Sequence, residues 1–108
     1  MAILGQIDCA ASTPLTPAAA NSVIPGGLTA NATVNILLAN RTAAAIEVSV
    51  YIVPSGTSSP AVKHAIHFNE QLDGYNVLER GGIPLNAGDL IFINPGAVGI
   101  SCSVVALS

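Results

Sequence analysis

The segment that most constrains the fold runs from Asn31 to Gly56, because apolar and polar residues alternate in it over lengths typical of β-strands. From Ile46 to Ile52 every second residue is a branched aliphatic, and the residues between them are Glu, Ser and Tyr. Successive side chains of a strand point to opposite faces of its sheet, so this period of two residues predicts a half-buried strand. A second apolar run lies just before it, at Thr33 to Ala39, and the polar turn Asn40 to Thr42 separates the two. The pattern predicts two strands joined as a hairpin. The face expected to line the core carries Ile46, Val48, Val50 and Ile52.

Similar short apolar runs recur along the chain, separated by turn-forming residues such as Gly81-Gly82. Many short strands at this spacing predict an all-β fold, namely a single antiparallel β-sandwich, jelly roll or small barrel that spans residues 1–108. Further strands are predicted at Ile3 to Asp8, Val62 to Phe68, Gly74 to Arg80, Asp89 to Asn94 and Ile100 to Leu107.

Residues 10–27 lack the strand pattern and contain Pro14, Pro17 and Pro25 before Gly26-Gly27. Proline removes a backbone donor and disfavours helical conformation in the residue before it, so a helix is not expected here. We expect an extended N-terminal arm or linker that gains order against a neighbouring subunit or a particle surface.

The chain is unusually poor in charge: it has three Lys+Arg and six Asp+Glu, and its charged fraction is 8%. Globular domains carry about 25% charged residues. Scattered cations also argue against nucleic acid, since phosphate binding needs several cations on one face. Leu90 to Ile93 is apolar on both faces, which predicts a central strand or one covered by another subunit. We therefore expect a homo-oligomer, with a trimer favoured.

The N-terminus lacks the basic and long apolar regions of a secretory signal, and no apolar run approaches the roughly 18 residues of a membrane span. We expect a soluble protein made in the cytoplasm, with no membrane partner. Cys9 and Cys102 are expected to be free buried thiols, although a disulfide is conceivable if the first and last strands are neighbours.

The only cluster of potential metal ligands in the sequence is formed by His64, His67 and Glu70. Residues three apart in a strand point to opposite faces, so the two histidines share a metal only if the strand bulges. The run from Leu85 to Gly96 is similar to part of a cupin barrel motif, but the histidines that a cupin places next are replaced by Val98-Gly99-Ile100. Gly88-Asp89 is better explained as a turn glycine followed by a carboxylate that caps backbone amides. The sequence predicts no metal, no cofactor, no catalytic residue and no enzyme activity.

Three short phrases occur in a fixed order: Asn40-Arg41-Thr42, Val53-Pro54-Ser55-Gly56 and Leu85-Asn86-Ala87-Gly88-Asp89. Their order, over about Thr33 to Leu107, resembles small β-sandwich structural proteins of tailed bacteriophages. The resemblance implies a non-enzymatic virion component made in the host cytoplasm. A capsid decoration or cement protein that binds the major capsid protein or other virion proteins is the leading hypothesis. The alternatives are a neck, tail or fibre-base accessory and a carbohydrate-binding sandwich for host attachment.

Overall fold

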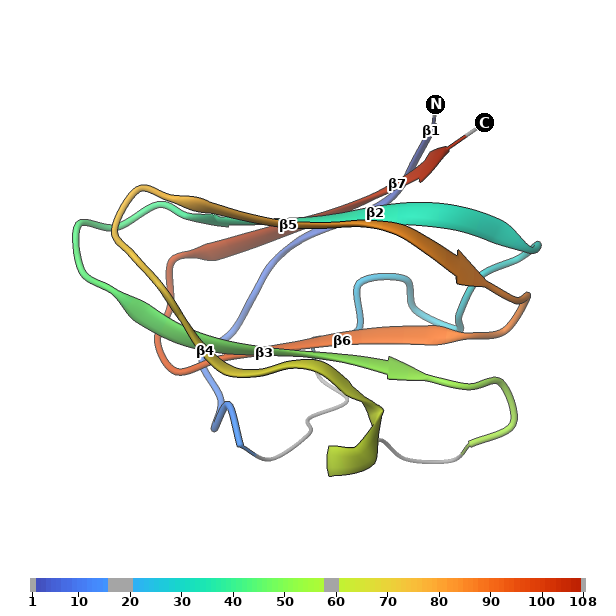
Figure 1. The fold of residues 1–108 in the computed structure, drawn as a ribbon, viewed down its shortest axis with the longest axis horizontal. Helices are drawn as coiled ribbons and strands as arrows, with labels where there is room; N and C mark the ends of the chain where they lie inside the picture. The colour runs from blue at the N-terminus through green and yellow to red at the C-terminus, as the bar shows by residue number, and fades with distance from the viewer. Residues whose placement is uncertain (1, 16–20, 58–60, 108) are drawn as a thin grey trace.

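The computed structural model describes residues 2–15, 21–57 and 61–107, and the fold in these ranges is all-β. The described strands form two antiparallel sheets, one ordered β1-β7-β2-β5 and the other β4-β3-β6, and these lie as two layers (Figure 1). This arrangement is compatible with the predicted β-sandwich. The elements are β1 (Ala2–Asp8), β2 (Ala32–Asn40), β3 (Ile46–Val53), the short 3-10 turn η2 (Val62–His64), β4 (Ala65–Leu72), β5 (Val77–Leu85), β6 (Leu90–Pro95) and β7 (Ile100–Leu107).

The two strands expected to form a hairpin lie in different sheets, so that prediction is wrong. β2 pairs with β5 and β7, whereas β3 pairs with β4 and β6. The five residues 41–45 cross from one layer to the other. Each strand thereby turns its apolar face toward the other sheet, and both faces are buried in one core. Alternation identifies a strand and its buried face, but it does not identify the strand beside it.

The core lies between the two sheets and contains the predicted face of β3. Ile46, Val48 and Val50 are buried in it, and Ile52 is partly buried against it. The opposite face of β3 was expected to be exposed, but Ser49 is also buried there. β3 is therefore covered on both faces. The other buried residues of the core are Cys9, Val23, Leu28, Val34, Ile36, Leu38, Leu72, Leu85, Ile91, Ile93, Ile100, Cys102 and Val104.

The predicted ends of two strands are wrong. Residues 62–64 form η2, and residues 74–76 belong to the turn before β5. β5 continues through Gly81 and Gly82, which the sequence suggested as a turn. The register of β5 against β2 shifts between Val34 and Ile36, and the side-chain Oδ1 of Asn35 accepts a hydrogen bond from the Gly82 N–H at 3.0 Å. The glycine pair therefore makes a bulge inside the strand, with φ of 67° at Gly82.

Part of the proline-containing segment lies across the outer face of the β4-β3-β6 sheet, below the lower layer in Figure 1. The Tyr51 hydroxyl donates to the Pro14 carbonyl at 2.9 Å, and the Asn94 side-chain amide donates to the Thr13 carbonyl at 3.4 Å. The Ser12 N–H donates to the Pro95 carbonyl at 2.8 Å. The described residues of this segment thus contact their own sheet, and the structure does not confirm a free arm. Residues 16–20, with Pro17, lie outside the described residues.

The chain also covers β6 itself. Ser22 forms an antiparallel bridge with Phe92, and the Val23 N–H donates to the Ile91 carbonyl at 3.0 Å. Phe92 is buried with Tyr51 and Val53 in a small cluster on the outer side of the sheet. Residues of the same chain therefore account for the burial of both apolar faces of β6, and no second subunit is needed to explain it.

Candidate functional site

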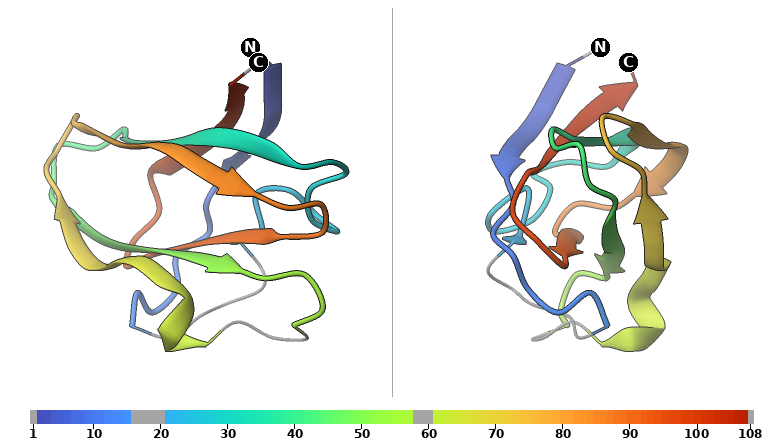
Figure 2. Two further views of the ribbon diagram at one scale, coloured as in Figure 1. Left: turned by 45° about the vertical axis from the view of Figure 1, so that its right-hand side comes forward. Right: turned by 90° about the vertical axis from the view of Figure 1, so that its left-hand side faces the viewer.

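The three motifs that carry the phage resemblance gather at the two ends of the fold. The first of them, Asn40 to Thr42, starts the crossing from β2 to β3, and the other two lie at the opposite end, where β3 ends and β6 begins. Figure 2 shows these loop clusters at the two ends of the layers.

Asn40 is a buried side chain that ties loops together. Its Nδ2 donates to the Ala44, Leu72 and Asp73 carbonyls at 2.8, 3.1 and 3.2 Å, and its Oδ1 accepts from the N–H and hydroxyl of Thr42 at 2.9 and 2.8 Å. These bonds join the crossing between the layers to the turn that follows β4. The amide therefore satisfies buried backbone groups, as such groups require, and this role is structural.

Asp89 joins the second and third motifs. Its Oδ1 accepts a hydrogen bond from the Ser55 N–H at 2.9 Å, and its Oδ2 accepts one from the Asn86 N–H at 2.8 Å. Gly88, with φ of 88°, makes the turn before it, and a Cβ at this glycine would clash with the Ser55 side chain. The prediction that glycine shapes this turn and that the aspartate caps backbone amides is confirmed.

The histidines and Glu70 do not form a metal centre. His67 Nδ1 lies 3.1 Å from Glu70 Oε2, whereas His64 Nδ1 accepts a hydrogen bond from the Ala61 N–H at 2.9 Å. β4 does bulge, with two register shifts against β3. Even so, within residues 2–15, 21–57 and 61–107 no three His, Cys, Asp or Glu side chains are placed to hold one ion.

The two cysteines are free and buried, with Cys9 directly after β1 and Cys102 in the neighbouring strand β7. Ile7 pairs with Cys102 in the β1–β7 ladder, and the Cys9 N–H donates to the Ile100 carbonyl at 2.8 Å, so the two thiols are diagonal neighbours. Burial, with a smaller effect of the Asp8 charge, raises the pKa of Cys9 to about 12, and burial also raises the pKa of Cys102. Both thiols are therefore neutral and poor nucleophiles near pH 7.

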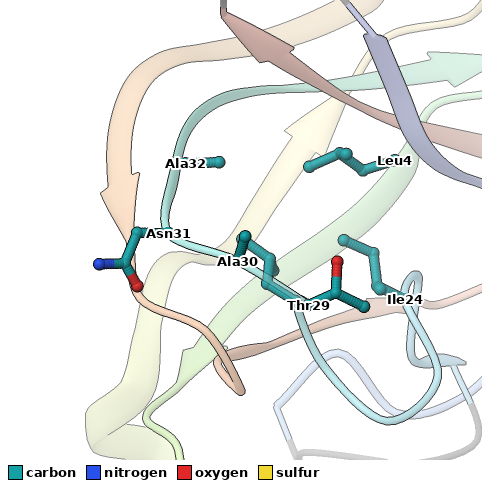
Figure 3. Close-up of a pocket in the computed structure, with 7 residues that line it drawn as sticks. Leu4, Ile24, Thr29, Ala30, Asn31 and Ala32 are labelled. Carbon is teal, nitrogen blue, oxygen red and sulfur yellow. The ribbon is translucent and has the colours of Figure 1, made fainter.

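A small apolar cavity of about 170 Å³ lies between β1 and the segment that leads into β2 (Figure 3). Its polar side chains are Thr29 and Asn31, and Asn31 Oδ1 already accepts a hydrogen bond from the Ala87 N–H at 2.8 Å. Among the described residues that line the cavity, none has a titratable side chain that could act as an acid or a base. The lining residues are Leu4, Ile24, Leu28, Thr29, Ala30, Asn31 and Ala32.

The sequence did not single out this cavity, because its walls come from segments about 20 to 28 residues apart that carry no shared pattern. The sequence does contain one sign of apolar surface here, the pair Ile3-Leu4. Consecutive side chains of a strand lie on opposite faces of the sheet, so only one of these two large apolar side chains can face the core.

Among the described residues, no helix is both long and apolar enough to pass through a membrane. Comparison with protein-family models, with characterised proteins and with solved structures finds no match to this chain.

Proposed function

We propose that this protein is a non-enzymatic structural component of a bacteriophage virion, a capsid decoration or cement protein that binds other virion proteins and associates with itself. It is made in the host cytoplasm and incorporated into the particle. The resemblance of the three motifs to phage structural proteins supports the assignment to this class of protein. The outer face of the β1-β7-β2-β5 sheet, which carries few charges, supports a role in protein association.

The observation that carries the proposal is the asymmetry between the two outer faces. The outer face of the β4-β3-β6 sheet is covered in part by residues 12–14. On the outer face of the other sheet, the register places mainly Ser, Thr, Asn, Gln and aliphatic residues, and Asp8 and Glu79 are the charged ones among the described strand positions. A sheet face with so few charges costs little to dehydrate, which suits it to contact another protein.

The strand order supports the finer description of the fold as a jelly roll. In an eight-stranded jelly roll, the first strand pairs with the eighth, the second with the seventh, the third with the sixth and the fourth with the fifth. If the bridge at Ser22 stands for a reduced second strand, the matching pairs are β1–β7, Ser22–β6, β2–β5 and β3–β4. The arm role remains part of this proposal for residues 16–20, which lie outside the described residues.

A mass-spectrometric inventory of purified particles, with copy number, tests the proposal. Hundreds of copies per particle are expected for a decoration or cement protein, whereas a dozen or fewer would indicate the neck, tail or fibre base. Absence of the protein from the particles would overturn the virion assignment.

A further inference from the structure

Each sheet has two edge strands. Three of these four edges have structural features that hinder pairing with a strand of another chain. The edge of β6 is occupied by residues 22–23. β5 has the charged pair Glu79-Arg80, the bulge and Pro84, a residue that cannot donate to a ladder. β4 has two register shifts and Asn69 with φ of 51°. Charges, proline, bulges and coverage are the usual protections of an edge.

The fourth edge, that of β1, lacks most of this protection. From Ala2 to Ile7 it has no charge and no proline, and within the described ranges β7 is the strand that pairs with it. The charge at its end, Asp8, forms an ion pair with Arg41. One register shift occurs near its start, between Ile3 and Gly5, and the ladder from Gly5 to Asp8 is regular.

Exposed apolar side chains gather on the same strand. Ile3 is 62% exposed and Leu4 is 37% exposed. The ends of β1 and β7 project beyond the body of the two layers in both orientations (Figures 1 and 2). Leu4 also forms one wall of the apolar cavity, so the exposed edge is continuous with apolar space beside it (Figure 3).

We propose that the free edge of β1 pairs antiparallel with the β1 edge of a second copy of this chain, which joins two four-stranded sheets into one continuous sheet. Unpaired N–H and C=O groups of an edge strand are satisfied by strand addition, and an antiparallel pair of identical segments is self-complementary about a two-fold axis. The proposal deepens the function proposed above by naming the surface of self-association, and it rests on that self-association rather than on a place in the virion.

Charge favours a second copy as the occupant. In an antiparallel pair centred near Gly5, the two Asp8 residues lie at opposite ends, about 20 Å apart for six residues of extended chain, which exceeds the screening length in physiological salt. The β1 residues that would pair with each other between the two Asp8 residues are all uncharged. Because a two-fold axis closes this pair, the expected assembly is a dimer, or a multiple of dimers, in place of the trimer expected from the sequence.

Light scattering on the purified chain tests the proposal with a matched pair of variants. Ile3 and Val77 are both 62% exposed and lie on opposite edges of one sheet. Ile3→Lys should raise the dissociation constant of the dimer by about tenfold or more, because lysine at a paired edge opposes strand addition. Val77→Lys should leave it unchanged. Wild-type protein that has only the 10.8 kDa mass at high micromolar concentration overturns the proposal, and so does equal dimerisation of the two variants.

Hydrogen exchange gives a second readout that a loss of folding would not imitate. Amides of β1 should become protected as wild-type concentration rises, while those of β5 should not change, and circular dichroism should show both variants folded. Protection of β5 but not β1 overturns the proposal. The particle inventory is independent: a dimer through β1 that is absent from particles refutes the virion role and leaves this interface intact.

Discussion

Tyr51 tests whether the N-terminal segment is part of the folded domain. Its side chain is fully buried on the outer side of the β4-β3-β6 sheet, and its hydroxyl donates to the Pro14 carbonyl. Tyr51→Phe removes this bond and leaves the carbonyl without its donor. Tyr51→Ala also removes the ring that packs with Val53 and Phe92.

The expected magnitudes follow from burial and from the single hydrogen bond. Loss of one such bond costs about 1 kcal/mol, which corresponds to a fall of roughly 4–8 °C in melting temperature for a domain of this size. Truncation of a buried aromatic ring to alanine costs about 3–5 kcal/mol, a large share of the roughly 5–15 kcal/mol that stabilises a typical domain. The other tyrosine, Tyr75, is 72% exposed, so Tyr75→Phe is the matched control and should have no effect.

Urea denaturation gives the free energies of unfolding, and limited proteolysis reports on residues 10–15. Tyr51→Phe should increase cleavage in this segment more than the modest loss of global stability accounts for. The reasoning is refuted if Tyr51→Ala costs less than about 1 kcal/mol and if cleavage is the same in wild-type protein and both variants. Such a result would mean that the segment does not cover the sheet in solution.

Three further predictions follow from the buried groups. Val50→Asp and Ser49→Asp should both prevent folding, as judged by circular dichroism, because each places a charge at a fully buried position of β3. Asp89→Ala should lower the free energy of unfolding in urea by about 1–3 kcal/mol, because it leaves two backbone N–H groups without their acceptor. Cys9 has its pKa raised from 9.0 to about 12, so unfolding releases its proton in this range, and the stabilisation present below pH 9 should decline as pH rises toward 12 in urea titrations.

The sequence was sufficient to find most strands, because alternation and turn residues are local properties. Ile100–Leu107 was predicted with the bounds that the structure has, and the alternation from Ile46 to Ile52 falls within β3, Ile46–Val53. The strand pairing that was predicted, a hairpin of Thr33–Ala39 with the next strand, was wrong, since pairing depends on how sheets stack rather than on any single segment. The bulge at Gly81-Gly82 was mistaken for a turn because glycine permits both, and the choice depends on Asn35, which lies 47 residues before Gly82.

The sequence predicted no cover for the second face of β3, and for Leu90 to Ile93 it left open a central strand or cover by another subunit. An apolar second face shows that something must cover a strand, but its pattern does not say what. Residues 12–14 bind that face largely through backbone groups, so their side chains carry little sign of the contact. The turn at Gly88-Asp89 was predictable because a Gly-Asp pair at the start of a strand has a local role. The hydrogen bond between Asp89 and the Ser55 N–H was not predicted.

The pairing of β1 with β7 also determines when this chain can complete its fold. Ala2 pairs with Ala106, a separation of 104 residues in a chain of 108. Contacts at such separation close the largest loop available and slow the search for the native state. During synthesis β1 leaves the ribosome long before β7, and it stays without its partner until β7 has also emerged. Ile3 and Leu4 therefore lack this partner over that interval, and the β1-β7-β2-β5 sheet can be completed only once β7 has emerged.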